Sequence, residues 1–277
     1  MRKLLSANFS RLGKDKIFWT ALLGVLFFSL AVIFSGSRSA NDMAARGFIR
    51  SLEDYYFGQA PYMGMVYAAF ISLFLGTEYS DGTMRNKLVV GHTRTHVFLG
   101  NFLTCFTACL AFAAAWFIGC APGLIWIGPF EMGIGGFLVY VLVAIGFTAS
   151  YAALFTLVST VCTNKAMTVI LTLGAWLGLV FLASAFHDRL SIPEMQSGMA
   201  LINGEFTMVE PTPHPLYIGG ALRTLCECIL DLLPSGQAIL MDGAAIAHPV
   251  RQIVFSLLLT GLLLVAGVLS FRRKNIK

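Results

Sequence analysis

Six long apolar runs without a charged residue in their interiors constrain this chain more than any other feature. The runs are residues 17–34, 61–77, 97–121, 132–161, 166–186 and 253–271. Each is close to or longer than the roughly 17–25 residues with which a helix crosses a hydrocarbon core. A buried helix of a soluble protein is rarely free of Asp, Glu, Lys, Arg and His over this length. The runs therefore predict an all-α integral membrane protein with six transmembrane helices.

Composition supports the same fold class. Only 12% of the 277 residues are charged and 57% are hydrophobic, against roughly 25% charged in an average soluble domain. We therefore expect residues 1–277 to form one transmembrane domain. The first apolar run is too long for the 7–15-residue core of a cleavable signal peptide, so we interpret it as the first crossing. A signal peptide ahead of five crossings is the alternative.

Most of the 19 Lys and Arg residues lie in the segments that share a side with the N-terminus. Because positive charge collects on the cytoplasmic side, this bias predicts that both termini are cytoplasmic. The net charge of +5 then indicates contact with anionic lipid of the inner leaflet. A nucleic-acid partner is not expected, because membrane helices separate the basic residues from one another.

Residues 1–16 have the pattern of an amphipathic helix that lies on the membrane surface. Leu4, Leu5, Phe9 and Leu12 recur at helical spacing, which predicts one apolar side. Basic residues supply the other side: Arg2, Lys3, Arg11, Lys14 and Lys16. The alternative is an ordinary basic flank.

Residues 78–96 form a polar segment between the second and third crossings. Ser80 or Asp81 is expected to cap a short helix there, and Gly91 is expected to end it. Leu88 and Val89 would anchor this helix. Four polar residues would face water or a partner: Thr83, Arg85, Asn86 and Lys87. The alternative is a solvated loop.

Residues 187–250 form a second polar segment, on the predicted outer side. Its first part contains several prolines, which exclude one long helix. Residues 218–233 are predicted to be helical, Pro234-Ser-Gly236 to break that helix, and residues 237–247 to form another short one. Both are too short to span a membrane, so we expect re-entrant or interfacial helices.

This order of segments resembles the membrane subunit of bacterial ATP-binding-cassette exporters of type 2. That class includes antibiotic, lantibiotic-immunity and polysaccharide exporters. The most specific match is the pattern Glu78…Gly82-Thr83…Arg85…Leu88…Thr93-Arg94. The chain departs from the family at Gly100-Asn101, where a basic residue often occurs.

The resemblance implies that residues 78–96 are a coupling segment, whose helix docks in a groove of a separate ATPase subunit. The residues assigned to coupling are Glu78, Asp81, Gly82, Thr83, Arg85, Asn86, Leu88 and Arg94. The sequence contains no Gly-x-x-x-x-Gly-Lys-Ser/Thr loop, so ATP and Mg²⁺ are expected on the partner and no cofactor on this chain. The resemblance also implies the bacterial cytoplasmic membrane and a dimer with a second permease copy or paralogue.

Other residues give less specific hypotheses. Gly174 and Gly178 form a GxxxG pattern that serves either internal packing or a dimer interface. Phe102, Phe106 and Trp116 are candidates for a substrate path that suits an amphipathic, peptide-like or lipid-like cargo; aromatic residues that face lipid are the alternative. Cys105 and Cys109 are one helical turn apart, and we interpret them as packing residues rather than metal ligands.

The predicted outer segment is acidic, which could attract cationic peptides, including antimicrobial ones to which an exporter would give resistance. Its acidic residues are Asp188, Glu194, Glu205, Glu210, Glu227, Asp231 and Asp242. Three other classes of protein stay open. A secondary transporter commonly has charged residues inside its crossings, and an intramembrane enzyme needs a catalytic motif; neither feature is visible in the sequence. A membrane sensor or assembly partner is the third.

Overall fold

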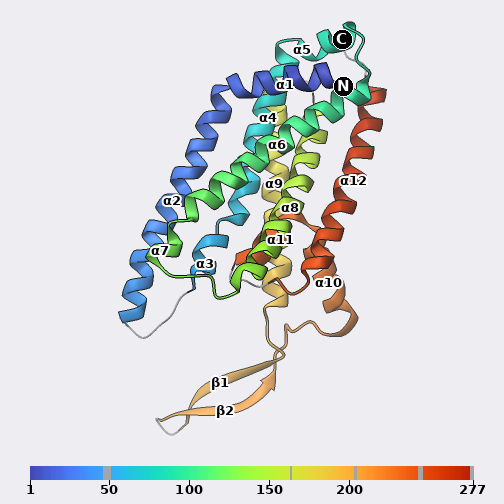
Figure 1. The fold of residues 1–277 in the computed structure, drawn as a ribbon. Coiled ribbons are helices and arrows are strands. Elements are labelled where there is room, and N and C mark those ends of the chain that lie inside the picture. The colour runs from blue at the N-terminus through green and yellow to red at the C-terminus, as the bar shows by residue number, and fades with distance from the viewer. Residues whose placement is uncertain (46–50, 163, 203–204, 243–245, 275–277) are drawn as a thin grey trace.

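The computed structural model describes residues 1–45, 51–162, 164–202, 205–242 and 246–274. Within these residues, six helical segments are long and apolar enough to cross a membrane, as predicted, and a bent helix pair described below would make seven if it formed one span. They pack side by side in an elongated bundle (Figure 1). The segments are α2 (Lys16–Ala45), α3 (Leu52–Phe57) with α4 (Ala60–Ser80), α6 (Arg94–Cys120) with α7 (Gly123–Trp126), α8 (Gly133–Val161), α9 (Lys165–Leu190) and α12 (Pro249–Arg273).

Two short helices lie across one end of the bundle, close to both termini (Figure 1). They are α1 (Arg2–Lys14) and α5 (Thr83–Val89), and we call this end the α5 end. The predicted helix at the N-terminus is present, and its Leu4 and Leu12 are buried. Phe9, which the spacing placed with them, is instead exposed, because it projects from the side of α1 that does not contact the bundle.

The first crossing is longer than its apolar run. The run ends at Phe34, but α2 continues to Ala45 because Ser35-Gly36-Ser37 does not break it. A Cβ atom at Gly36 would lie 2.6 Å from Cδ1 of Tyr55. The small residue therefore lets the extended part of α2 pack closely on α3.

The opposite end of the bundle carries a β-hairpin that the sequence did not predict. Strands β1 (Met195–Ile202) and β2 (Glu205–Pro213) pair antiparallel, from Met195 opposite Pro213 to Ile202 opposite Glu205. The hairpin extends away from the helices (Figure 1), and we call this end the hairpin end. The chain is thus predominantly helical rather than strictly all-α.

Two helices follow the hairpin, α10 (Gly220–Leu232) and α11 (Pro234–Met241), with their axes bent by 96°. The predicted break at Pro234 is present. The second helix begins three residues earlier than expected, because proline is compatible with the first turn of a helix, and it ends at Met241 instead of 247. Residues 243–245 lie outside the described part. A Cβ atom at Gly236 would lie 2.0 Å from the carbonyl oxygen of Leu230, so only glycine permits this close turn.

Close packing of α6 against α12 depends on one glycine, which gives a testable prediction. A Cβ atom at Gly267 would lie 2.1 Å from Cζ of Phe98, whereas one at Gly261 has nothing within 4 Å. We expect Gly267→Ala to lower the free energy of unfolding by about 1–3 kcal/mol, as overpacking does. Gly261→Ala, on the same helix, should keep it unchanged or raise it by up to about 1 kcal/mol, because alanine favours a helix over glycine. Thermal unfolding of the detergent-solubilised variants measures the difference, and equal stabilities would contradict this packing.

Candidate functional site

Helix α5 is held between two glycines in left-handed conformations. Gly82 has φ 66° and precedes Thr83, and Gly91 has φ 96° and follows the helix. The N–H groups of Gly91 and His92 donate to the carbonyl oxygens of Leu88 and Lys87 at 3.0 and 3.2 Å. This is a Schellman termination, so the prediction that Gly91 ends the helix is confirmed.

The predicted cap of α5 is wrong. Neither Ser80 nor Asp81 caps the helix, because α4 continues through Ser80 and the Asp81 N–H donates to the carbonyl oxygen of Thr77 at 2.9 Å. Gly82 occupies the N-cap position without a side chain. Thr83 instead fixes the turn, since its Oγ1 donates to the carbonyl oxygen of Glu78 at 3.0 Å.

The two faces of α5 differ from the prediction at Lys87 and Val89, and Met84, which had no predicted role, is buried. Met84 is the buried anchor, in a cluster with Leu4, Phe98 and Phe271, and Leu88 packs against that cluster as expected. Val89, expected to anchor, is 77% exposed. Lys87, expected to face water, points into the protein. Among the described residues, the outward face of α5 carries Arg85, Asn86, Val89 and the adjoining Val90.

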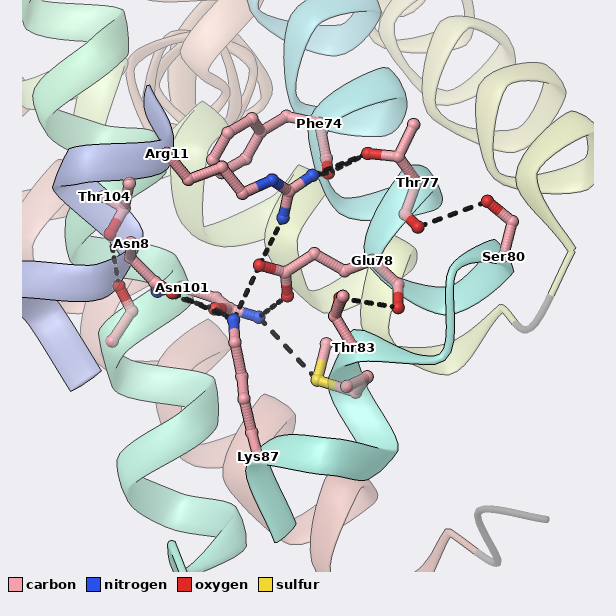
Figure 2. Close-up of polar contacts among 12 residues, drawn as sticks. Asn8, Arg11, Phe74, Thr77, Glu78, Ser80, Thr83, Lys87, Asn101 and Thr104 are labelled. Carbon is pink, nitrogen blue, oxygen red and sulfur yellow. Dashed lines mark hydrogen bonds and ion pairs between the residues drawn. The ribbon is translucent and has the colours of Figure 1, made fainter. Parts of the chain in front are cut away.

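Glu78, at the end of α4, is the centre of a buried polar cluster (Figure 2). Its side chain is only 1% exposed. Oε1 accepts from Nη1 of Arg11 at 2.5 Å and from Nζ of Lys87 at 2.6 Å, and Oε2 accepts from Nδ2 of Asn101 at 3.2 Å. Burial of a carboxylate is costly unless it is paired and hydrogen-bonded, and this carboxylate is both.

Arg11 joins α1 to the end of α4. Its Nη2 donates to the carbonyl oxygen of Phe74 at 2.8 Å and to Oγ1 of Thr77 at 2.6 Å. The guanidinium also lies over the Phe74 ring, 4.3 Å from its centroid. One planar cation thereby contacts a carboxylate, a carbonyl, a hydroxyl and an aromatic face, which fixes the position of α1 on the bundle.

Lys87 joins α5 to α1 and α6 (Figure 2). Its Nζ donates to Oδ1 of Asn8 at 2.9 Å and to Oδ1 of Asn101 at 3.3 Å, besides Glu78. Nδ2 of Asn8 also donates to Oδ1 of Asn101 at 3.0 Å. Asn101 is thus a neutral member of a cluster that already contains two cations.

These contacts define the Glu78 cluster: Asn8, Arg11, Glu78, Lys87 and Asn101. Its members come from α1, α4, α5 and α6, so four elements meet on one carboxylate. The cluster has a structural role, since both cations and both amide side chains form hydrogen bonds with other members of the cluster. A displacement of α5 is therefore expected to move α1 and the ends of α4 and α6 with it, because the ion pairs and packing link these elements.

A second set of contacts ties α12 to the same end. Nη1 of Arg94, in the first turn of α6, donates to the carbonyl oxygens of Phe271 at 3.0 Å, Arg272 at 3.1 Å, and Lys274. These are unpaired groups at a helix C-terminus, which favour a cation. Lys274 in turn donates through Nζ to the carbonyl oxygens of Thr160 and Cys162 at the end of α8, at 2.6 and 2.8 Å. Burial lowers the pKa of the Lys274 ammonium.

The residues predicted for coupling therefore fall into two groups. Glu78, Thr83, Leu88 and Arg94 contact this chain itself. Asp81, Arg85 and Asn86 are exposed at the α5 end, and Gly82 sets the turn between α4 and α5. Contact with an ATPase stays a prediction for all of them.

The aromatic residues predicted to line a substrate path lie in the helix core. Trp116 is fully buried and its Nε1 donates to the carbonyl oxygen of Tyr56 at 2.9 Å. Phe102 is buried and stacks on Phe106, with ring centroids 5.8 Å apart. These three side chains pack the bundle and do not line the apolar groove described below.

That groove runs between α2 and α4 and has a volume of about 570 Å³. Apolar side chains form its walls, including Ala21, Phe28, Val66 and Phe70 on the two helices. Its hairpin end has a polar pair, because Oγ of Ser29 donates to Oε1 of Gln59 at 2.8 Å. From Ile17 to Phe28, the α2 wall is about 17 Å long at 1.5 Å per residue.

Gly174 and Gly178 lie on an open face of α9. A Cβ atom at either glycine meets nothing within 4 Å, so these residues are not needed for packing within the chain. Around them α9 presents exposed apolar side chains: Met167, Ile170, Leu171, Leu177, Phe181 and Leu182.

The acidic residues of the predicted outer segment are partly neutralised. Asp231 is buried and accepts from Nε of Arg251 at 2.6 Å, and Glu227 pairs with Arg223 at 3.3 Å. Asp188, Glu194 and Asp242 are exposed, whereas the side chains of Glu205 and Glu210 lie outside the described part. Within the described residues, no group of three or more His, Cys, Asp and Glu is placed to hold a metal ion.

Sequence reasoning missed Arg11, Lys87 and Asn101 as partners of Glu78, and it missed Asn8 as a partner of Lys87 and Asn101. A signal was present for two of them. Asn8 and Arg11 lie four and seven residues after Leu4, on the same helical face as the buried Leu4 and Leu12. Polar residues on a buried face must find polar partners, but helical spacing does not say which ones.

The sequence is similar to that of a known protein family. A family model described as an ABC-2 family transporter protein matches residues 4–182. The match covers more than half of the chain, from α1 through most of α9, and includes the whole Glu78 cluster. No curated protein matches the sequence.

Proposed function

Because the chain belongs to the ABC-2 transporter family, we propose that it is the membrane permease subunit of an exporter driven by a separate ATPase. The family is a membrane transport component and not itself an ATPase. ATP and Mg²⁺ would bind to the partner, and this chain would supply the path through the bacterial cytoplasmic membrane. The bias of the basic residues supports a cytoplasmic α5 end, where α1 would contact anionic lipid.

One observation carries this proposal: α5 is fixed rigidly on its inner side and open on its outer side. The Glu78 cluster and Met84 hold the inner side. The outer side carries Arg85 and Asn86 beside Val89 and Val90, both 77% exposed. Exposed apolar side chains next to charged ones are typical of a protein interface. A short helix of this kind suits a groove on a partner.

The movement would pass through the contacts at the α5 end. A rotation of the ATPase that displaces α5 would act through Glu78 on α4 and through Lys87 and Asn101 on α6. It would reach α1 through Arg11. The contacts of Met84 with Phe271 and of Arg94 with the end of α12 extend the same route to the last crossing.

The groove between α2 and α4 is the best candidate for the cargo path. Its walls suit a hydrocarbon chain or apolar side chains, and Ser29 with Gln59 offers a polar group at one end. This chemistry fits an amphipathic peptide or lipid, so resistance to antimicrobial peptides is one role of such an exporter. The exposed Asp188, Glu194 and Asp242 would favour cationic cargo on the outer side.

The same face of the molecule would meet a second permease copy or a paralogue. The open Gly174 and Gly178 of α9 allow another helix to approach closely. Helices α2 and α9 both contact α4, so a partner against this face would close the groove from the lipid. The cargo path would then lie between two permease subunits.

The proposal is tested by co-expression with an ABC ATPase encoded beside it and reconstitution of the complex into vesicles. Candidate amphipathic peptides and lipids should stimulate ATP hydrolysis and be transported. Failure of the two chains to co-purify would contradict the proposed partnership. Hydrolysis that no cargo class changes would contradict the transport function.

A variant that fills the groove tests the cargo path separately. Gly24 lines the groove, and a Cβ atom there meets nothing within 4 Å, so Gly24→Phe should fold and occupy the space. We expect at least a ten-fold loss of cargo-stimulated transport with basal ATP hydrolysis retained. Gly261→Phe, at an equally open position on α12, is the control. Equal transport by both variants would remove the groove from the path.

A further inference from the structure

A second apolar groove lies between α6 and α12, near the α5 end. It has a volume of about 240 Å³. Leu99 of α6 forms one wall, and Leu264, Val265, Val268 and Leu269 of α12 form the other. Val265 and Leu269 are 61% and 51% exposed, so the groove opens to the side of the bundle, where a membrane protein meets acyl chains.

One arginine closes the α5 end of this groove. Arg272 is exposed, lines the groove, and is held in place because its Nε donates to Oγ1 of Thr95 at 3.2 Å. From Leu264 to Arg272 the α12 wall is about 12 Å long at 1.5 Å per residue. An apolar groove of this length, with a guanidinium at its α5 end, matches the shape of a lipid whose acyl chain continues from a phosphate group.

We propose that the groove between α6 and α12 binds one anionic phospholipid, with its phosphate on Arg272 and an acyl chain along Leu264 to Leu269. The charge of the site favours an anionic lipid over a zwitterionic one. The next residue, Arg273, is also exposed but does not line the groove, so it adds only general positive charge. Arg272 is therefore the residue that selects the headgroup.

The position of this site links lipid binding to the α5 end. The carbonyl oxygen of Arg272 accepts from Arg94 at 3.1 Å, and Val268 packs against the cluster that contains Met84 and Phe271. A lipid in the groove would thus hold α12 against α6 beside the contacts that secure α5. This goes beyond transport of cargo, because the lipid would stay bound as a structural ligand.

The experiment measures retained lipid on the purified full chain by native mass spectrometry. The chain is incubated with phosphatidylglycerol or phosphatidylcholine of the same acyl composition, with soluble glycerol phosphate as a third arm. We expect one phosphatidylglycerol to be retained in preference to phosphatidylcholine, and no effect of glycerol phosphate, because the acyl chain is needed.

Two variants and one control identify the site. Arg272→Gln should reduce the preference for phosphatidylglycerol about five-fold, the effect of one basic residue at an anionic surface. Val268→Trp should displace both lipids by filling the groove, and Arg273→Gln should behave as wild type. Equal retention of the two lipids by wild type would overturn the proposal. So would an equal effect of the two arginine substitutions, which would indicate general surface charge. Unchanged thermal unfolding of each variant shows that it folds, and none of these readouts requires an ATPase.

Discussion

Glu78→Ala is expected to lower the free energy of unfolding by about 3–5 kcal/mol, the usual cost of breaking a buried ion pair from one side. The substitution leaves Arg11 and Lys87 facing each other without their shared carboxylate, and Asn101 loses an acceptor. The measurement is unfolding of the detergent-solubilised chain, followed by helix content against temperature or denaturant. Asp81→Ala is the matched control, because that carboxylate lies three residues away and is exposed; it should change stability by less than about 0.5 kcal/mol.

A combined variant separates the stability of the cluster from its proposed role in coupling. In the triple variant Arg11→Met, Glu78→Leu and Lys87→Met, apolar side chains of similar size replace the three charges. Such replacements often restore stability, so we expect the triple variant to unfold closer to wild type than Glu78→Ala does. If Glu78→Ala is as stable as wild type, the carboxylate is not the centre of a buried cluster.

The six crossings were predictable because an apolar run is a local property of the sequence. Hydrocarbon excludes charge, so a run of sufficient length without charge predicts a helix wherever it occurs. The ends of the helices were less predictable. Helix α2 continues past Phe34 to Ala45, since helix formation needs only the absence of a breaker and not an apolar side chain. The hairpin of β1 and β2 was missed although the sequence carries a signal for it, the dipeptide Asn203-Gly204 between two apolar stretches.

The coupling segment shows where sequence reasoning stops. Its helix and its end at Gly91 were predictable, because glycine tolerates the left-handed conformation. Which residues face inward was not predictable, since helical spacing groups residues without saying which group is buried. Met84 and Lys87 face inward and Val89 faces outward because Glu78 requires a cation within reach of α5. Glu78 is 67 positions from Arg11 and 9 positions from Lys87 in the sequence. The way in which these three charges meet is therefore a property of the tertiary structure.

The partition of α5 into a fixed side and an open side also explains why its charges should differ in function. Lys87 and Arg85 are two residues apart, yet Lys87 is paired with a buried carboxylate and Arg85 is exposed. Substitution of Lys87 is expected to act on folding, whereas substitution of Arg85 is expected to act on the partner. Loss of coupling without loss of stability therefore tests docking of the ATPase only for substitutions on the open side of α5.

Arg85→Glu is expected to uncouple ATP hydrolysis from transport without unfolding the permease. If Arg85 is a central contact of the docked helix, its loss costs about 2 kcal/mol or more, so binding of the ATPase should weaken by about 30-fold or more. Asp81→Lys, at the exposed start of the same segment, should have a smaller effect of the same kind. The measurements are affinity for the purified ATPase, cargo-stimulated hydrolysis and transport in reconstituted vesicles.

Lys14→Glu provides the control for this charge reversal, because Lys14 is an exposed cation at the end of α1 and not on α5. It should leave binding of the ATPase within about two-fold of wild type, a difference below 0.5 kcal/mol. The two reversals change net charge equally, so a general electrostatic effect would weaken both variants alike. Wild-type export and wild-type ATPase binding by Arg85→Glu would show that the open side of α5 is not the docking surface. The exposed Val89 and Val90 would then need another partner, since two neighbouring valines at 77% exposure are stable in water only at the cost of hydrating their apolar surface.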